Sequence, residues 1–341
     1  MCSGAPIFVI AEAGVNHNGD IETAHRLVDT AAKVGADAVK FQTFTADRIA
    51  THSSPLADYQ REGVGFEETM QEMLSELVLS PEAHRELKAH AEEAGVVFLS
   101  SPFDEDSADF LAELGVSAIK LGSGELTNTP LLRHVAAKGL PVILSTGMGT
   151  LEEVREAVRV FAGTRSQVAL MHCTSSYPTP PQDANMRVIR TLMDRFALPV
   201  GYSDHTEGHV AAVAATALGV CILEKHLTLD RTMKGPDHRA SADPDSFADY
   251  VEKVREAERC MGSGEKQPVM AEFAVMSASR KSIVAARDIS KGSVLTSEML
   301  TAKRPGTGIS PAKMNEIIGR RASVDIPEDT LISESMIDTD A

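Results

Sequence analysis

Eight short apolar runs, separated by amphipathic stretches, are the feature of this chain that most restricts its fold. Each run is rich in β-branched residues and lacks polar alternation, which is typical of strands buried on both faces of a parallel sheet. The stretches between them show helical spacing, as the crossover connections of a parallel sheet require. The runs begin, in chain order, at Pro6, Asp37, Val96, Ser117, Pro141, Val168, Pro199 and Val220.

This alternation predicts an α/β fold, namely a (β/α)8 TIM barrel over residues 1–261. A doubly wound open sheet is the alternative, but no GxGxxG pattern follows the first run. Helix starts support the repeat: Asp20 is a plausible N-cap, Ser80 precedes a proline, and Thr150 begins a capping-box sequence. A further helix is expected over residues 183–196.

Two segments depart from the repeat. Residues 44–79 form a connection far longer than usual between the second run and its helix, with a possible helix over 67–77. In a barrel this connection lies at the carboxyl ends of the strands, so it is predicted to be a lid over a substrate site or a structural decoration. After residue 261 the sequence becomes turn-rich, which predicts a linker over residues 262–281 and a small β-rich domain over residues 282–341.

Composition and charge argue against several classes of protein. The net charge of -16 disfavours nucleic-acid binding, which needs a basic surface. No apolar stretch is long enough to span a bilayer and no signal-peptide pattern is present, so a cytoplasmic protein without membrane contact is expected. The four cysteines include no CxxC pair, so neither a zinc ribbon nor a redox motif is indicated.

Polar or ionisable residues end every run, and a barrel gathers its strand ends on one face, where active sites are built. Lys40 and Lys120 are the strongest candidates, because lysine inside an apolar strand is costly unless it is paired or functional. Lysines surrounded by hydroxyls suit a phosphate group. The other polar residues in or just after these runs include Glu12, Gln42, Ser101, Ser123, Glu125, Ser145, Ser175, Tyr177, Ser203, His205, Glu224 and His226.

His205 and His226 end neighbouring strands, so both imidazoles could reach one divalent metal ion. Either histidine alone is more often a hydrogen-bonded structural residue, and a strand-end serine is usually a helix N-cap. Two imidazoles without a cysteine ligand suit manganese, magnesium or cobalt better than a closed zinc site. Glu12 and Glu125 are candidates for acid, base or sugar-binding roles, and Asp237 lies in a loop expected to reach over the barrel mouth.

Nine runs occur in a fixed order along the chain: IAEAGVNHNG, VKFQTF, IKLGSGE, ILSTGM, HCTSSYPTP, GYSDHT, LEKHLTLD, GPDHRAS and KRPGTGISP. Together they resemble the bacterial N-acetylneuraminate synthase family, which includes legionaminic and pseudaminic acid synthases. The resemblance implies a TIM barrel followed by a small SAF or antifreeze-like domain. It also implies a transferase that condenses phosphoenolpyruvate with an amino sugar, and a domain-swapped homodimer in which Arg304 of one subunit reaches the sugar in the other.

The same resemblance implies roles for individual residues. His205 and His226 match the metal ligands, usually of manganese, with Glu12 as a carboxylate close to the metal and Lys40 nearby. Positions around phosphoenolpyruvate match Ser101, Lys120, Ser123, Ser145 and Ser203, and positions near the amino sugar match Gln42, Glu125, Tyr177 and Asp237. The catalytic set is therefore expected to be Glu12, Lys40, Lys120, Glu125, Asp237 and Arg304.

The acceptor sugar is open between two candidates. The GPDHRAS loop resembles the neuraminate and legionaminate branches, which predicts an N-acetylmannosamine-type sugar or, alternatively, 2,4-diacetamido-2,4,6-trideoxymannose. Ser175 stands where some neuraminate synthases have asparagine, and it is expected to contact the substrate. Two other functions are weighed against this one: a Schiff-base aldolase with Lys40 or Lys120 as nucleophile, and a non-enzymatic carbohydrate-binding protein.

Overall fold

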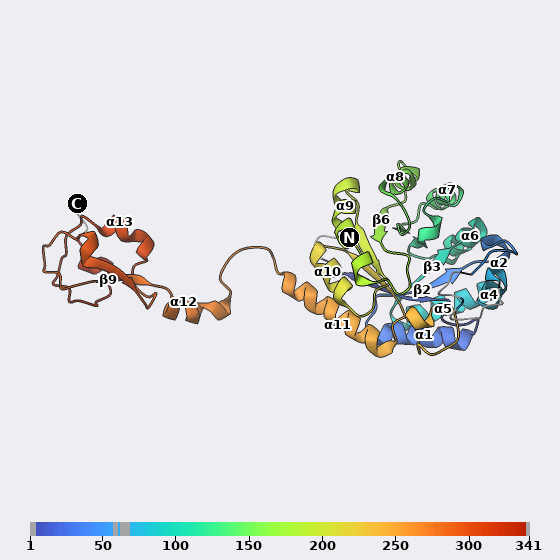
Figure 1. The fold of residues 1–341 in the computed structure, drawn as a ribbon, viewed down its shortest axis with the longest axis horizontal. Helices are drawn as coiled ribbons and strands as arrows, with labels where there is room; N and C mark the ends of the chain where they lie inside the picture. Colours follow the sequence, from blue (N-terminus) through green and yellow to red (C-terminus); the bar gives the residue numbers. More distant parts are fainter. Residues whose placement is uncertain (1–4, 57–60, 62–68, 339–341) are drawn as a thin grey trace. The chain divides into compact units, whose positions relative to one another are not determined.

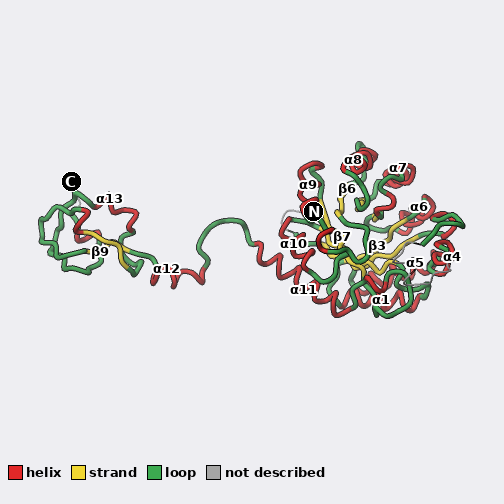
Figure 2. The backbone as a smooth tube through the Cα atoms, in the orientation of Figure 1, coloured by secondary structure: helices red, strands yellow, loops and turns green. Residues whose placement is uncertain are grey.

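The structure, a computed structural model, describes residues 5–56, 61 and 69–338 (Figure 1). The chain divides into two compact units, of which the first ends at Gly262 and the second begins at Ser263. In the first unit, helices surround a central group of parallel strands (Figures 1 and 2). In the described part of the chain, no helix is long and apolar enough to cross a membrane.

All eight predicted strands are present in the first unit. They are β1 (Phe8–Gly14), β2 (Ala38–Thr43), β3 (Val97–Pro102), β4 (Ile119–Leu121), β5 (Val142–Ser145), β6 (Val168–His172), β7 (Val200–Asp204) and β8 (Ile222–His226). Parallel ladders join them in the order β3-β2-β1-β8-β7-β6-β5-β4. The neighbours β3 and β4 pack together without such a ladder, so the barrel has one seam that lacks strand pairing. The (β/α)8 barrel is therefore confirmed.

Helices connect successive strands as predicted. The longer ones are α1 (Ile21–Lys33), α5 (Pro81–Ala94), α6 (Glu105–Leu114), α7 (Thr129–Lys138), α8 (Leu151–Val160), α9 (Arg187–Phe196), α10 (Val210–Leu218) and α11 (Pro244–Met261). The Asp20 side chain caps α1, and Thr150 begins a capping box on α8. Helix α9 begins four residues later than the predicted residue 183, because Asn185 has a φ of 42°, a left-handed conformation that a helix cannot contain.

Side chains in the strands alternate between two apolar cores. One core lies between the strands and the surrounding helices, and a smaller one fills the barrel interior, with Ile10, Leu99 and Ile222 among its members. Because side chains two residues apart in a strand point the same way, Glu12 and Glu224 face the interior above this apolar floor. The same alternation along the other strands places their inward-facing polar residues at the mouth of the barrel.

The long connection after β2 contains two short helices, α2 (Ala46–Ile49) and α4 (Met70–Glu76). Together they form a separate small apolar cluster that includes Phe44, Leu56 and Met73. The helix predicted over residues 67–77 is confirmed for 70–76, whereas residues 67 and 68 lie outside the described part of the chain.

The second unit contains α12 (Phe273–Ser279), the antiparallel pair β9 (Ser282–Ala285) and β10 (Leu300–Lys303), and α13 (Met314–Ile317). Isolated bridges such as that between Val284 and Leu331 extend the pairing. Its own apolar core includes Ile283, Leu295 and Ile332. The predicted small β-rich domain is present, although much of its chain forms turns and single bridges rather than regular strands.

Candidate active site

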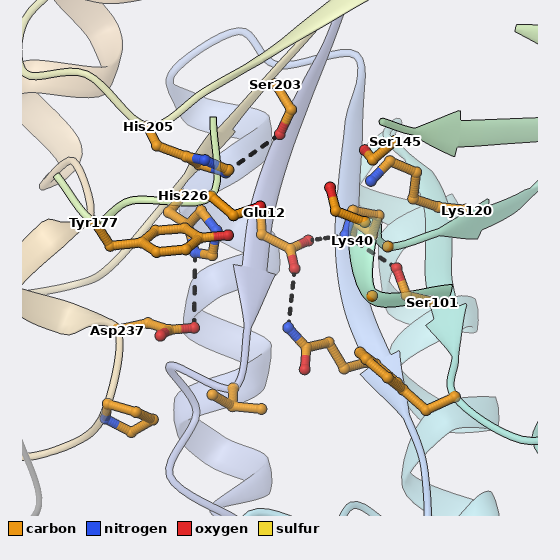
Figure 3. Close-up of a pocket in the computed structure, with 18 of the residues that line it drawn as sticks. Glu12, Lys40, Ser101, Lys120, Ser145, Tyr177, Ser203, His205, His226 and Asp237 are labelled. Carbon is orange, nitrogen blue, oxygen red and sulfur yellow. Dashed lines mark hydrogen bonds and ion pairs between the residues drawn. The ribbon is translucent and has the colours of Figure 1, made fainter. Parts of the chain in front are cut away.

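A cavity of about 440 Å³ opens at the carboxyl ends of the barrel strands. It collects nearly all of the polar residues that the sequence singled out, although they are spread over more than 200 positions of the chain (Figure 3). The predicted residues that line it are Glu12, Lys40, Gln42, Ser101, Lys120, Ser123, Ser145, Ser175, Tyr177, Ser203, His205, His226 and Asp237.

Two buried lysines and two buried carboxylates form the centre of this cavity. Lys40 Nζ lies 2.6 Å from Glu12 Oε2 and 3.7 Å from Glu224 Oε2. Lys120 Nζ lies 3.2 Å from Glu224 Oε1. All four side chains are at most 5% exposed, so each charge depends on its partners rather than on water. Glu224 thus lies between the two lysines and neutralises part of both charges.

The two carboxylates titrate in opposite directions. Burial raises the pKa of Glu12 to about 7, although Lys40 opposes the rise. Burial alone would also raise the pKa of Glu224, but the pull of Lys120 and Lys40 outweighs it and lowers that pKa. Burial would lower the pKa of Lys40, but Glu12 and Glu224 raise it, so this ammonium group stays charged. Glu12 is therefore the carboxylate that can exchange a proton near neutral pH.

Hydroxyl groups surround the lysines. Lys40 Nζ donates to Ser101 Oγ at 3.1 Å, and Ser203 Oγ donates to Glu224 Oε1 at 2.9 Å. Ser145 Oγ is buried without a hydrogen bond to any described residue, so it can still donate to or accept from a ligand. Lysine charges beside available hydroxyls suit the binding of a phosphate or carboxylate group.

A second group of hydroxyls surrounds Gly147, which follows β5. Ser123 Oγ accepts a hydrogen bond from the Gly147 backbone nitrogen at 3.0 Å and lies 3.1 Å from Cys173 Sγ. A Cβ atom at position 147 would lie 2.5 Å from Ser175 Oγ and 2.7 Å from Ser123 Oγ. Only glycine leaves these two hydroxyls undisturbed at the cavity wall.

The two predicted metal ligands lie next to each other, with ring centroids 5.6 Å apart (Figure 3). His205 Nδ1 donates to the Thr174 carbonyl oxygen at 2.7 Å, which leaves Nε2 with the lone pair of the neutral ring. Ser203 lies 3.4 Å from that nitrogen, but its hydroxyl proton is directed to Glu224. Burial lowers the pKa of both imidazoles, which favours the neutral form that binds metals.

His226 Nδ1 is buried and forms no hydrogen bond with the described residues. Asp237 Oδ2 lies 3.8 Å from this nitrogen. Burial raises the pKa of Asp237 to about 6, so this carboxyl group takes up a proton only slightly below neutral pH. An unpaired nitrogen beside a second neutral imidazole fits a divalent cation, although the described residues offer no cluster of three histidine, cysteine or carboxylate ligands.

The loop that carries Asp237 is fastened to the loop after β1. Asn18 Nδ2 donates to the Lys234 carbonyl oxygen at 2.9 Å, and Asn18 Oδ1 lies 3.1 Å from His238 Nε2. Asn16 Nδ2 donates to Ser241 Oγ at 2.9 Å. Asn16 and Asn18 therefore hold the Asp237 loop against the barrel mouth.

One side of the cavity is apolar, in contrast to the strand ends. We name this surface the apolar wall; its members come from α2, α4 and the loop after β3, and they are Ile49, Met70, Met73, Leu74, Leu77 and Phe103. The prediction that the long connection covers a substrate site is thus supported by its described part. Residues 57–60 and 62–68 of the connection lie outside the described chain.

Two predicted residues do not line the cavity. Glu125 follows the lining residues Ser123 and Gly124, but its carboxylate accepts a hydrogen bond from Asn128 Nδ2 at 2.7 Å beside the cavity. Arg304 is exposed and follows β10 in the second unit. Within the described part of the first unit, the Glu125 carboxylate forms no hydrogen bond or ion pair with the cluster of lysines and carboxylates.

Glu224 is a residue of the site that the sequence places at a strand end but for which no role is predicted. Two signals were available. It precedes His226 by two residues and so faces the same side of β8. Two buried lysines also require two buried counter-charges, and Glu12 supplies only one.

The chain matches the models of one known protein family and one known domain. Residues 27–266 match the NeuB family, and residues 280–338 match the SAF domain. The NeuB match covers most of the barrel, including every cavity residue from Lys40 to Asp237. The SAF match covers β9, β10 and α13, which confirms the predicted type of the small domain.

Named relatives cover nearly the whole chain. The N,N'-diacetyllegionaminic acid synthase of Legionella pneumophila is 46% identical over 335 residues, which are 97% of this chain and 94% of that protein. The human N-acetylneuraminate-9-phosphate synthase is 38% identical and covers 98% of this chain and 93% of its own length. The crystal structure of N-acetylneuraminic acid synthetase from Leptospira borgpetersenii in complex with citrate is 34% identical, has a TM-score of 0.72, and covers 80% of this chain and 90% of its own.

Proposed function

The chain belongs to the NeuB family, and we propose that it condenses phosphoenolpyruvate with the open-chain form of an N-acetylmannosamine-type sugar. The products are a nine-carbon sialic acid and inorganic phosphate. One observation supports this assignment above the others: a single cavity holds two buried lysines among serine hydroxyls beside two neutral imidazoles. The first group suits an anionic phosphate ester, and the second suits a cation that activates a carbonyl group.

Phosphoenolpyruvate carries close to three negative charges. Lys40 and Lys120 supply the opposing charge, and the hydroxyl of Ser145 is available to donate to the phosphate. The serines around Gly147 extend this donor surface. Binding of this anion also requires the lysines to exchange part of their contact with Glu12 and Glu224 for contact with the substrate.

We assign His205 and His226 as the protein ligands of a divalent metal, with manganese as the first candidate and magnesium or cobalt as alternatives. The neutral rings and the unpaired nitrogen of His226 support this assignment. The remaining ligand positions fall to water and substrate oxygens, as in an open catalytic site. When bound, the metal supplies Lewis-acid polarisation of the sugar aldehyde.

The reaction forms one carbon–carbon bond and one bond from carbon 2 to a water oxygen, and it breaks the bond from carbon 2 to the phosphate oxygen. Carbon 3 of phosphoenolpyruvate attacks the aldehyde carbon, and the aldehyde oxygen becomes a hydroxyl by taking a proton. Water then adds to carbon 2 of the former enol and loses a proton. The tetrahedral centre collapses to a ketone as its hydroxyl proton passes to the departing phosphate and its bond to the phosphate oxygen breaks. The oxygen that bridged carbon and phosphorus leaves with the phosphate.

We assign Glu12 as the group that accepts the proton of the attacking water. Its pKa of about 7 lets it accept a proton near neutral pH and return it later in the cycle. Gln42 Nε2 donates to Glu12 Oε1 at 3.3 Å, and Lys40 contacts the other carboxylate oxygen, so the group is held in one orientation. Tyr177 and Asp237 lie on the imidazole side of the cavity, where they are placed to orient the sugar (Figure 3).

A Schiff-base aldolase is the rival reaction on this barrel. It needs a lysine with a neutral amine, but Glu12 and Glu224 raise the pKa of Lys40 and keep it charged. Borohydride added during turnover distinguishes the two reactions. Covalent trapping of a substrate on Lys40 or Lys120 would establish the aldolase, whereas unchanged protein mass agrees with the synthase.

The direct test is release of phosphate from phosphoenolpyruvate with and without N-acetylmannosamine or its 4-acetamido-4,6-dideoxy analogue. The proposal requires release that depends on one of the sugars. Lys120→Met should lower kcat/KM for phosphoenolpyruvate by at least about 100-fold. The substitution removes a buried positive charge that pairs with Glu224 and that the proposal directs to the substrate anion. Lys253→Met is the matched control, since that lysine is partly exposed on α11, outside the cavity, and pairs with Glu256 of the same helix. Sugar-independent release, or none, would refute the assignment.

We further propose that the enzyme is a cytoplasmic homodimer in which Arg304 of one subunit contacts the sugar bound to the other. Arg304 is exposed and follows β10 in the second unit, which leaves its guanidinium group accessible to another molecule. Co-expression of Arg304→Ala and His226→Gln chains tests the arrangement. If Arg304 acts on the partner, the mixed dimer keeps one intact site and about half of the activity. If it acts within its own subunit, both sites of the mixed dimer are inactive.

A further inference from the structure

We propose that a buried ion pair behind the barrel wall positions the two histidines that we assign as metal ligands. The pair is Asp204 and Lys225, and it acts through Thr206. In the chain, His205 lies between Asp204 and Thr206. His226 directly follows Lys225. The inference rests on the proposed function, because it concerns the imidazoles that hold the metal there.

The pair joins two neighbouring strands on the side away from the cavity. Asp204 and Lys225 are partners in the parallel ladder between β7 and β8, and Lys225 Nζ lies 3.6 Å from Asp204 Oδ2. Both side chains are at most 7% exposed. Lys225 Nζ also lies 5.1 Å from the centre of the Tyr250 ring on α11, within the range of a cation–π contact. The pair alternates along the chain with the cavity-lining residues Ser203, His205, Glu224 and His226.

Thr206 connects the pair to the turn that carries His205. Its backbone nitrogen and its hydroxyl donate to Asp204 Oδ1 at 2.8 and 2.7 Å. Lys225 Nζ donates to the Thr206 carbonyl oxygen at 2.7 Å. The pair thus binds all three polar groups of Thr206 and fixes the backbone just beyond His205. Because Lys225 belongs to β8, the same bond ties this turn to the strand that carries His226.

The direction of the His205 ring depends on this turn. The His205 carbonyl oxygen accepts from the Thr179 backbone nitrogen at 2.7 Å, and Thr179 forms a β-bridge with Thr206. On the ring, Nδ1 donates to the Thr174 carbonyl oxygen at 2.7 Å. These bonds leave Nε2 as the ligand atom, and a shift of the turn at Thr206 would change where it points.

Stability alone is a weak reason for a buried ion pair at this place. Burial lowers the pKa of Lys225, and Asp204 opposes the fall. Apolar side chains of similar volume often stabilise a core as well as a buried pair does. They offer no directional bond to Thr206, however, and would leave its carbonyl oxygen and hydroxyl without these partners. Outer residues that orient metal ligands typically change metal affinity by about 10- to 100-fold.

The test measures manganese binding to the full-length protein, with free manganese followed by electron paramagnetic resonance. The paired variant Asp204→Asn with Lys225→Met removes both charges together, so neither is left buried alone. We expect it to raise the Kd of manganese about tenfold, the lower end of the range, because the pair acts through the backbone. Excess manganese should restore most of kcat, since the defect lies in metal binding.

Thr206→Val is the second variant and decides the matter if the paired variant does not fold. It replaces the hydroxyl with a methyl group of similar size and should raise the Kd at least about threefold, because a hydrogen bond to a charged group is lost. Thr206→Ser keeps the hydroxyl and should bring the Kd back towards the wild-type value.

Thr216→Val is the matched control. Thr216 is equally buried, and its hydroxyl donates to the Ala212 carbonyl oxygen at 2.9 Å within α10. This variant should change the melting temperature but not the Kd of manganese. A wild-type Kd in the folded Asp204, Lys225 and Thr206 variants, or an equal rise in Thr216→Val, overturns the inference while the metal assignment stands. A wild-type protein that binds no manganese overturns the metal assignment and this inference together.

Discussion

Replacing Glu224 with glutamine removes the carboxylate that lies between the two buried lysines. Its oxygens are 3.2 Å from Lys120 Nζ and 3.7 Å from Lys40 Nζ. At an effective dielectric constant of about 20, these contacts correspond to gross attractions of about 5 and about 4.5 kcal/mol. Removing Glu224 also removes its own cost of burial, so the net loss of unfolding free energy is expected to be about 3–5 kcal/mol.

The same substitution should strengthen phosphoenolpyruvate binding. Glu224 repels the incoming anion and competes with it for both lysines, so its neutralisation is expected to lower the Kd about tenfold, or about 1.4 kcal/mol. Urea denaturation measures the first effect and isothermal titration calorimetry the second. Glu207→Gln is the control, because that exposed glutamate pairs with Arg231 at 3.4 Å and should change stability by at most about 0.5 kcal/mol. Unchanged stability of Glu224→Gln would refute the assignment of Glu224 as the shared counter-charge.

Three further predictions follow from other parts of the molecule. Gly147→Ala should lower kcat/KM for phosphoenolpyruvate about 10- to 100-fold, with little change in melting temperature, because the new Cβ displaces cavity hydroxyls. A chelator should abolish phosphate release, and manganese should restore it in the wild type but not in His226→Gln; activity that survives chelation contradicts the metal assignment. Burial lowers the pKa of His17 to about 4, below the value of about 6.5 in the unfolded chain. Through this shift the free energy of unfolding is at its full value above about pH 6.5 and falls by up to about 3 kcal/mol towards pH 4. Urea titrations at several pH values should show a weaker fall in His17→Gln.

The barrel could be predicted from the sequence because its strands are buried on both faces. Such strands are continuous apolar runs, and Asp20, Ser80 and Thr150 mark helix starts through local hydrogen bonds that are encoded within three residues. The start of α9 could not be placed in this way. It depends on the left-handed backbone of Asn185, which the helical spacing of its neighbours does not reveal.

The candidate site could be predicted to a large extent for the same reason. Parallel strands deliver their ends to one rim, so a list of polar strand ends already names most residues of the cavity. The list does not show which of these residues contact one another. The role of Glu224 follows only when its distances to Lys40 and Lys120 are known. The apolar wall depends on how α4 docks, which is a long-range contact that local sequence does not encode.

The proposed reaction joins phosphoenolpyruvate to an acetamido sugar in the barrel by cleaving a carbon–oxygen bond. It is tested most directly with phosphoenolpyruvate that carries oxygen-18 between carbon 2 and phosphorus. We expect one phosphate released per sugar consumed, no release without sugar, and all of the label in the phosphate. Label retained in the sugar acid, or phosphate released without sugar, would contradict it.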